Sequence, residues 1–317
     1  MSMNLVPAQL RAAMQRVAAV AEQVETVIHG KHEEVLLSLV PLMAGGHLLL
    51  QDVPGVGKST LAQALGQSIG ATFSRIQFTS DLLPADILGV NVFEAGVGDF
   101  RFRQGPVFAN IVMADEINRA SPKTQSALLE AMNDRQVSID GTTWKLPDPF
   151  FVIATQNPVE YAGTYPLPES ELDRFLLCMA IGYPDTDAER RILAERPIRQ
   201  RNAPLEPVAT VDDVLKMQEA VDQVTVAPAI LDYLLAFVHA TREEPLFEVG
   251  VSPRGSIDLL RSVRAWALLQ GRAFVVPDDI KTMAPFVVAH RIVRRGSRRG
   301  ATQADLGHVF ERVPAPA

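Results

Sequence analysis

Residues 48–65 read LLLQDVPGVGKSTLAQAL, and this stretch decides the fold class. An apolar run leads into a glycine-rich loop, and apolar residues then recur at helical spacing. A strand, a glycine-rich loop and a helix in this order are typical of a phosphate-binding loop, where backbone N–H groups and the helix N-terminus bind the anion. The stretch therefore predicts an α/β fold with a parallel central sheet and a nucleotide site.

The loop departs from the usual pattern G-x-x-x-x-G-K-[ST] at Asp52, which stands at the position of the first glycine. That glycine mostly eases the turn out of the strand, whereas phosphate is cradled further along. Lys58 supplies a point charge to the β- and γ-phosphates, and Ser59 offers a hydroxyl to Mg²⁺. We therefore predict a working nucleotide site formed by Pro54, Gly55, Val56, Gly57, Lys58, Ser59 and Thr60.

Two further apolar runs end in polar residues, IVMADE at 111–116 and FFVIATQN at 150–157. Short runs without alternation are typical of parallel strands buried on both faces. Asp115 is expected to hold Mg²⁺, usually through water, and Glu116 to polarise an attacking water. The amide of Asn157 is suited to hold that water or the γ-phosphate, although an asparagine before proline also makes an ordinary turn.

The composition changes near residue 184, where a charged, proline-containing segment begins. Beyond it only helical patterns are evident, at 211–223, 227–241, 253–270 and 277–291. We predict a nucleotide-binding αβα domain at 1–183, which begins with an amphipathic helix, and a helical domain at 184–317.

Composition and charge exclude several classes of protein. The single cysteine, Cys178, excludes a disulfide framework and a multi-cysteine zinc site. The net charge of −7 argues against a general nucleic-acid binder. The longest uncharged stretch, 35–51, is interrupted by proline and glycine and is shorter than the roughly 20 apolar residues of a membrane span. We therefore expect a cytoplasmic protein without a membrane span.

Two β-hairpins are predicted inside the first domain, at about 90–104 and 136–147. Three large apolar side chains lie on the first of them, Phe93, Phe100 and Phe102. A two-stranded ribbon is marginally stable alone, so these rings need a surface to pack on. That surface is either the body of this protein or a partner protein, and we predict partner contact.

Arg254 lies in the first turn of a predicted helix, after Ser252 as N-cap and Pro253 at the first position. A cation there is unfavourable by about 0.3–1 kcal/mol because it faces the positive end of the helix dipole. A bound phosphate would reverse this local field. The alternative interpretation is a solvated arginine.

Five motifs together resemble those of the MoxR-type AAA+ ATPases, in the same order over residues 24–295: QDVPGVGKS, MADEINRASPKTQSALLEAM, VIATQNP, LPESELDRF and GVSPRGSIDLL. The resemblance implies an AAA+ αβα sandwich followed by a smaller all-α lid. It implies Walker A for GVGKS, and the hairpins would be the helix-2 insert and the pre-sensor-1 hairpin. The other implied roles are Walker B for Asp115 and Glu116, sensor 1 for Asn157, an arginine finger toward a neighbouring subunit for Arg174, sensor 2 for Arg254, and the adenine border for Val27, Ile28 and Gly30.

The same resemblance implies Mg-dependent ATP hydrolysis by a ring, commonly a hexamer, that remodels or matures partner protein complexes. It also implies a partner with a von Willebrand factor A domain, while the client stays unidentified.

Two alternatives remain at this point. A nucleic-acid motor or restriction-type subunit would use Arg101, Arg103 and the cluster Arg291, Arg294, Arg295, Arg298 and Arg299. A nucleotide-gated scaffold would bind nucleotide with little turnover. A GTPase is disfavoured because no N-K-x-D motif occurs.

Overall fold

The computed structural model describes residues 7–96, 98–157, 163–194, 204–296 and 300–316. Within these ranges a five-stranded parallel sheet has the order β2-β5-β8-β1-β9. Its strands are β1 (Leu48–Gln51), β2 (Phe73–Gln77), β5 (Ile111–Asp115), β8 (Phe151–Gln156) and β9 (Leu177–Met179). The parallel central sheet predicted from the sequence is confirmed.

The three strands predicted from apolar runs are the central ones, β1, β5 and β8. They are buried almost throughout, as expected for strands covered on both faces. The two edge strands were not predicted, because β2 is mostly exposed and β9 has only three residues. Since the central strands run parallel, their carboxyl ends share one edge of the sheet, which brings Asp52, Asp115 and Asn157 to that edge.

The helices around the sheet begin where the sequence has helix-start signals. Ser121 caps α5 by accepting a hydrogen bond from the Thr124 N–H, and Pro122 occupies the first turn, as predicted. The helices and helical turns of this part are α1 (Ala8–Glu25), α2 (His32–Met43), α3 (Lys58–Ser68), α4 (Pro84–Leu88), η2 (Ile117–Arg119), α5 (Pro122–Asp134) and α6 (Glu169–Leu172).

The second half of the chain is mostly helical. Its helices are α7 (Thr186–Ala194), α8 (Val211–Asp222), α9 (Pro228–Glu243), α10 (Pro253–Leu269), α11 (Pro277–Val287), η3 (Ala289–Arg291) and α12 (Gln303–Glu311). The prediction of helices alone is wrong, because β10 (Phe247–Val249) pairs antiparallel with β11 (Val293–Arg294). Strands of two and three residues are too short to produce an alternating pattern.

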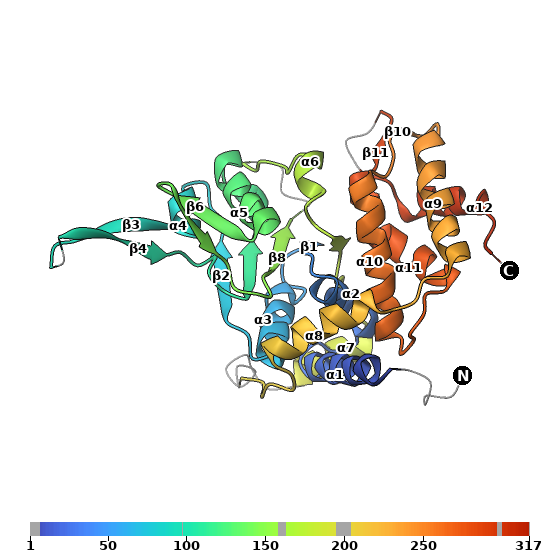
Figure 1. Ribbon diagram of the computed structural model, residues 1–317, viewed down its shortest axis with the longest axis horizontal. Helices are drawn as coiled ribbons and strands as arrows, with labels where there is room; N and C mark the ends of the chain where they lie inside the picture. The colour runs from blue at the N-terminus through green and yellow to red at the C-terminus, as the bar shows by residue number, and fades with distance from the viewer. Residues whose placement is uncertain (1–6, 97, 158–162, 195–203, 297–299, 317) are drawn as a thin grey trace.

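The buried side chains form two clusters on opposite faces of the sheet. One cluster lies between the sheet and α5 and includes Leu49, Val112 and Leu128. The other contains Leu48 and Leu50 and continues through α1, α2 and α3 into α8, α9, α10, α11 and α12. The helical region therefore shares a core with the N-terminal helices. In Figure 1, α8 lies beside α1. The boundary at residue 184 falls between β9 and α7, and we retain it as a proposal.

Both predicted hairpins are present, β3 (Gly89–Glu94) with β4 (Asp99–Gln104), and β6 (Gln136–Ile139) with β7 (Thr142–Lys145). The β3–β4 hairpin projects from the end of the molecule opposite α9 and α12 (Figure 1). Phe93 and Phe100 are 55% and 64% exposed, and their ring centroids are 5.4 Å apart.

The prediction that Phe102 contacts a partner is not supported, because its side chain packs within the protein. Its ring stacks on Trp144 of β7, with centroids 4.7 Å apart, and also contacts Phe108 edge-on. A hydrogen bond of 2.7 Å from Asn91 to Asp140 joins the two hairpins beside this stack. Phe102 therefore anchors the projecting hairpin to the body of the protein.

Candidate nucleotide site

One cavity of about 250 Å³ collects most of the predicted site residues. Its lining comes from the phosphate-binding loop with the start of α3, and from the carboxyl ends of β5 and β8. The residues are Pro54, Gly55, Gly57, Lys58, Ser59, Thr60, Arg75, Asp115, Glu116, Thr155 and Asn157. Val56 was also predicted, but its side chain packs against the core beside the loop.

The loop takes its shape from two glycines in the left-handed region, Gly55 at φ 86° and Gly57 at φ 98°. Such angles are strained for any other residue, which explains why glycine occupies both positions. Gly57 directly precedes α3, and among the described residues no side chain caps this helix. The first-turn N–H groups of α3 are thus left for an anion.

Asp52 has a structural role that the sequence pattern did not show. Its buried carboxylate accepts hydrogen bonds from the backbone N–H of Val53 at 2.8 Å, Ile181 at 2.8 Å and Gly182 at 2.7 Å. The latter two follow β9 and lead toward α7. The residue that replaces the first glycine therefore ties the phosphate-binding loop to the segment that connects the sheet with the helical region.

Lys58 points along the loop. Its Nζ donates hydrogen bonds of 2.8 Å to the carbonyl oxygens of Asp52 and Val53. Burial lowers the pKa of Lys58, and three carboxylates act in the opposite direction, those of Asp52, Asp115 and Glu116. A phosphate at this loop competes with the two carbonyls for the Lys58 ammonium.

Asp115 is held on both carboxylate oxygens. Its Oδ1 accepts a hydrogen bond of 2.6 Å from the Thr155 hydroxyl, and its Oδ2 lies 2.5 Å from Nη2 of Arg75. The Thr155 hydroxyl in turn accepts a hydrogen bond of 2.8 Å from the Glu116 N–H. The two acidic residues are therefore positioned by the neighbouring strand β8.

Glu116 adopts a left-handed backbone conformation, with φ 56°, which is uncommon outside glycine. Its Oε2 accepts a hydrogen bond of 2.9 Å from the Gln77 amide and lies 3.1 Å from Nε of Arg119. The surroundings of Glu116 thus orient its carboxylate at the cavity, a placement that suits a general base.

Sequence reasoning missed Arg75, Gln77 and Thr155. Arg75 and Gln77 lie on the exposed edge strand β2, which the apolar pattern did not identify. Their spacing of two residues, which puts both on one face of a strand, is the only signal that could have grouped them. Lys58 is therefore not the sole cation at the cavity, because Arg75 also lines it.

The predicted adenine border lies beside the loop. A Cβ placed on Gly57 would be 3.9 Å from Cδ1 of Ile28. Gly30 has φ 68°, and a Cβ there would be 2.8 Å from Cβ of Ala188 in α7. Val27 packs at the edge of the core. This segment therefore runs between the phosphate-binding loop and the start of α7.

The residues present fit Mg²⁺ and a nucleotide phosphate. A hydroxyl from Ser59 and a carboxylate from Asp115 line the same cavity, and Mg²⁺ prefers such hard oxygen ligands. The glycine-rich loop, the uncapped α3 and Lys58 supply donors and positive charge for phosphate.

Two family models and several known proteins match this chain. A family model described as "ATPase family associated with various cellular activities (AAA)" matches residues 47–177, and one described as "AAA lid domain" matches residues 239–307. The protein "Uncharacterized protein YeaC" of Bacillus subtilis (strain 168) is 51% identical over 272 residues, covering 86% of this chain and 85% of YeaC. "Chaperone MoxR1" of Mycobacterium tuberculosis (strain ATCC 25618 / H37Rv) is 41% identical over 280 residues, covering 86% of this chain and 74% of MoxR1.

The chain belongs to the MoxR-type AAA+ ATPases. Its fold agrees with the crystal structure of a candidate ATPase from Cytophaga hutchinsonii ATCC 33406, with a TM-score of 0.90 and 34% identity over 100% of both chains. The sheet with its helices is the AAA domain, and the helical region contains the AAA lid.

The two arginines that the MoxR-type motifs single out do not line this cavity. Arg174 donates a hydrogen bond of 2.7 Å to the Leu129 carbonyl oxygen. Arg254 donates a hydrogen bond of 2.9 Å to Asn133 and lies 3.8 Å from Oδ2 of Asp173. Both arginines thus gather near the C-terminal half of α5. The Asp173 carboxylate also offsets the unfavourable position of Arg254 at a helix N-terminus.

Most arginines of the cluster near the C-terminus form ion pairs or hydrogen bonds within the chain. Arg291 is buried and lies 2.7 Å from Oδ2 of Asp258. Arg294 lies 3.6 Å from Asp305, and Arg295 donates to the Phe247 carbonyl oxygen at 3.1 Å. The two remaining members, Arg298 and Arg299, lie outside the described residues. Arginines with partners inside the chain are less available to bind nucleic acid, so the cluster gives less support to a nucleic-acid interface.

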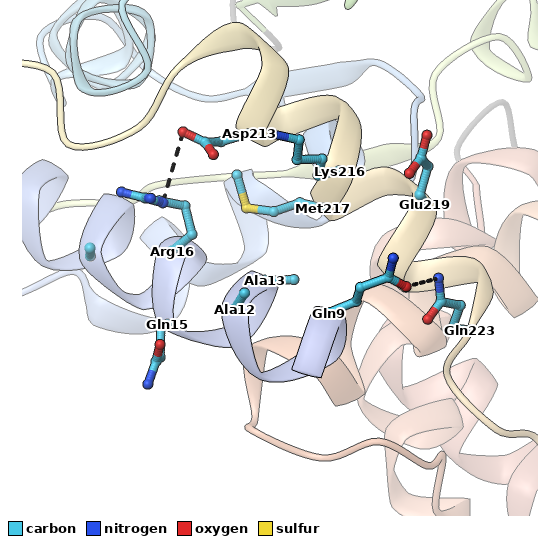
Figure 2. A pocket seen from close by; sticks show the side chains of 11 residues that line it. Gln9, Ala12, Ala13, Gln15, Arg16, Asp213, Lys216, Met217, Glu219 and Gln223 are labelled. Carbon is cyan, nitrogen blue, oxygen red and sulfur yellow. Dashed lines mark hydrogen bonds and ion pairs between the residues drawn. The ribbon is translucent and has the colours of Figure 1, made fainter. Parts of the chain in front are cut away.

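A larger cavity of about 550 Å³ lies between α1 and α8 (Figure 2). Its polar side chains pair across the two helices, with Arg16 at 3.8 Å from Asp213 and Gln223 donating to Gln9 at 3.2 Å. None of the predicted site residues lines it. Size alone would therefore select a cavity that contains none of the residues that the motifs single out.

Two absences hold for the part of the chain that the structure describes. No helix there has the length and apolar character needed to cross a bilayer. In the same residues no group of three or more histidine, cysteine or acidic side chains could hold a metal ion.

Proposed function

We propose that this protein hydrolyses ATP in a Mg-dependent reaction, and that it does so as a ring-forming ATPase that remodels or matures partner proteins. The observation that carries the proposal is the convergence of three separate segments on one cavity. Lys58 and Ser59 begin α3 directly after the loop, Asp115 and Glu116 lie at the end of β5, and Asn157 directly follows β8. Phosphoryl transfer depends mainly on positioning and charge stabilisation, which such a constellation supplies.

Each residue has a separate task in the proposed reaction. The loop N–H groups and Lys58 bind the phosphates. Ser59 and Asp115 would hold Mg²⁺, Asp115 through water, and the ion would neutralise part of the phosphate charge. Glu116 accepts hydrogen bonds from Gln77 and contacts Arg119, and from that position it orients and deprotonates the attacking water. Asn157 holds the water or the γ-phosphate.

The positions of Arg174 and Arg254 support assembly into a ring. Both lie away from the cavity of their own chain, near α5. An arginine that stabilises a transferring phosphoryl group can be supplied by a neighbouring molecule. We therefore assign both arginines to the site of an adjacent subunit, and we propose a hexamer because rings of this family commonly have six subunits.

The remodelling role rests on the similarity to a protein named a chaperone and on the exposed tip of the β3–β4 hairpin. Clustered exposed aromatic side chains mark interaction sites. We propose that Phe93 and Phe100 contact the client or a partner with a von Willebrand factor A domain, and that this occurs in the cytoplasm.

Lys58→Ala is the primary test of the nucleotide site. It removes the loop's ammonium, so we expect ATP affinity measured by calorimetry to fall at least tenfold and phosphate release to stop. Lys123→Ala is the matched control, because Lys123 is an exposed lysine at the start of α5. Equal ATP affinity in the two variants would exclude the proposed site.

The client is best identified with a trapped complex. Glu116→Gln should bind ATP without rapid turnover, so proteins captured on it with ATP are candidate clients. The double variant Lys58→Ala, Glu116→Gln serves as control, since it should capture none of them. Phosphate release by the unmodified protein separates an ATPase from a nucleotide-gated scaffold, which would show almost none.

A further inference from the structure

We propose that Arg75 is an exchangeable counter-ion of Asp115, which Mg²⁺ displaces and which then binds a nucleotide phosphate. The proposal rests on the proposed function, because it concerns the same cavity. Arg75 would then be a second cation, besides Lys58, that binds phosphate. Whether Arg75 pairs with Asp115 or with phosphate would depend on whether the metal is bound.

Both oxygens of Asp115 already have partners, and the two partners differ in freedom. Thr155 belongs to the central strand β8 and is 1% exposed. Arg75 belongs to the edge strand β2, and its side chain is 51% exposed. An ion that uses Oδ2 of Asp115, directly or through a water ligand, competes with the guanidinium there. Arg75 is therefore the partner that leaves, while Thr155 continues to orient the carboxylate.

The ion pair is not needed to align the two strands. β2 and β5 are already paired in parallel over five residue pairs, from Phe73 opposite Ile111 to Gln77 opposite Asp115. A pair in which one partner is half exposed contributes little to stability. The 2.5 Å contact between Arg75 and Asp115 thus matters mainly for the charge balance of the cavity.

Once released, the Arg75 guanidinium remains at the cavity, because the strand that carries it lies along the wall. Arginine presents a planar fork of donors that matches the oxygens of a phosphate. The charge of Glu116 is already partly balanced, since its Oε2 accepts a hydrogen bond from Gln77 and lies 3.1 Å from Nε of Arg119. Phosphate is therefore the favoured acceptor in the same cavity.

A double-mutant cycle with ADP in EDTA isolates this behaviour. Asp115→Asn removes the charge that holds Arg75, so the guanidinium becomes available without metal. We expect Asp115→Asn to bind ADP more tightly than the unmodified protein, by about threefold to tenfold. Adding Arg75→Gln should then weaken binding by roughly tenfold, the scale of a lost charge-assisted hydrogen bond.

The control is Arg101→Gln in the same Asp115→Asn background, since Arg101 is an exposed arginine paired with Glu94 on the projecting hairpin. Arg75→Lys should retain part of the effect, and it replaces Arg75→Gln if the latter fails to fold. A crystal structure of Glu116→Gln with Mg²⁺ and ATP should show Arg75 on a phosphate oxygen.

Two results would overturn the inference. One is an ADP affinity of the double variant within twofold of that of Asp115→Asn. The other is a crystal structure in which Arg75 still pairs with Asp115 while Mg²⁺ is bound. Failure of the unmodified protein to bind ADP or ATP at all would instead exclude the proposed function.

Discussion

The motifs singled out the residues of the phosphate-loop cavity and also Arg174 and Arg254, but the structure places these two groups in different regions. In the cavity, residues from the loop, β5 and β8 converge within one chain. In the arginine region, Arg174 and Arg254 bond to Leu129, Asn133 and Asp173. Motifs of one enzyme family therefore do not have to meet in one subunit. In the proposed ring, arginines of one neighbour complete this cavity, and the arginines of this chain complete the cavity of the other neighbour.

Arg174→Ala should produce the largest effect and tests this comparison directly. We expect hydrolysis to fall by roughly 10³–10⁵, the contribution of an arginine to phosphoryl transfer, with unchanged ATP affinity of the isolated subunit. Phosphate release and calorimetry measure the two quantities. Mixing this variant with Lys58→Ala should restore part of the activity, because mixed interfaces pair an intact loop with an intact arginine.

Arg190→Ala is a suitable control for that experiment, since Arg190 is exposed and paired with Asp187. Mixed assemblies that exchange subunits but stay inactive would contradict action across the interface.

Glu116→Gln should have the next largest effect. The variant keeps the shape of the side chain but loses the base, so hydrolysis should fall by roughly 10²–10⁴ while ATP binding persists. Single-turnover phosphate release with a binding measurement checks both parts. Normal turnover would mean that Glu116 merely ends its strand.

Arg254→Ala sharpens the assignment of the lid arginine. A lost charge-assisted hydrogen bond costs about 1.5–3 kcal/mol, so we expect hydrolysis to fall by roughly tenfold to a hundredfold. ADP affinity measured under dissociating conditions should stay within twofold, because Arg254 does not line its own cavity. A large loss of affinity in the isolated subunit would place Arg254 in its own site.

The last prediction concerns stability rather than activity, and it involves the arginine region alone. Two histidines border the arginine region, His47, which is buried, and His290, which is partly buried. Nε2 of His47 donates to the Met132 carbonyl and Nε2 of His290 donates to that of Phe175, both at 3.1 Å. Burial lowers the pKa of His47 to about 4 and that of His290 to about 3. The folded chain therefore binds fewer protons than the unfolded chain between those values and 6.5.

Stability should consequently be complete above pH 6.5 and fall as the pH decreases, by up to about 1.4 kcal/mol per unit for each ring. Urea unfolding at pH 7, 6 and 5 measures this slope. His290→Asn should flatten it, whereas the exposed His308→Asn should not. A slope that is identical in both variants would remove His290 from the explanation.

The burial of each strand explains whether the sequence predicted it. The central strands were predictable because β1, β5 and β8 are covered on both faces and so read as continuous apolar runs. The edge strand β2 and the short β10 and β11 gave no such signal. Arg75 was missed for this reason, since its strand was missed.

By itself the sequence determined the phosphate-binding loop, the acidic pair and Asn157, because local spacing and the shared edge of a parallel sheet require no distant contact. Only the tertiary structure decided the partners of Asp52, which lie 129 and 130 residues away at Ile181 and Gly182. It also decided that Phe102 packs on Trp144 and that Arg254 bonds to Asn133. Such contacts depend on how separate elements pack, and packing between distant elements leaves no periodic trace in a single sequence.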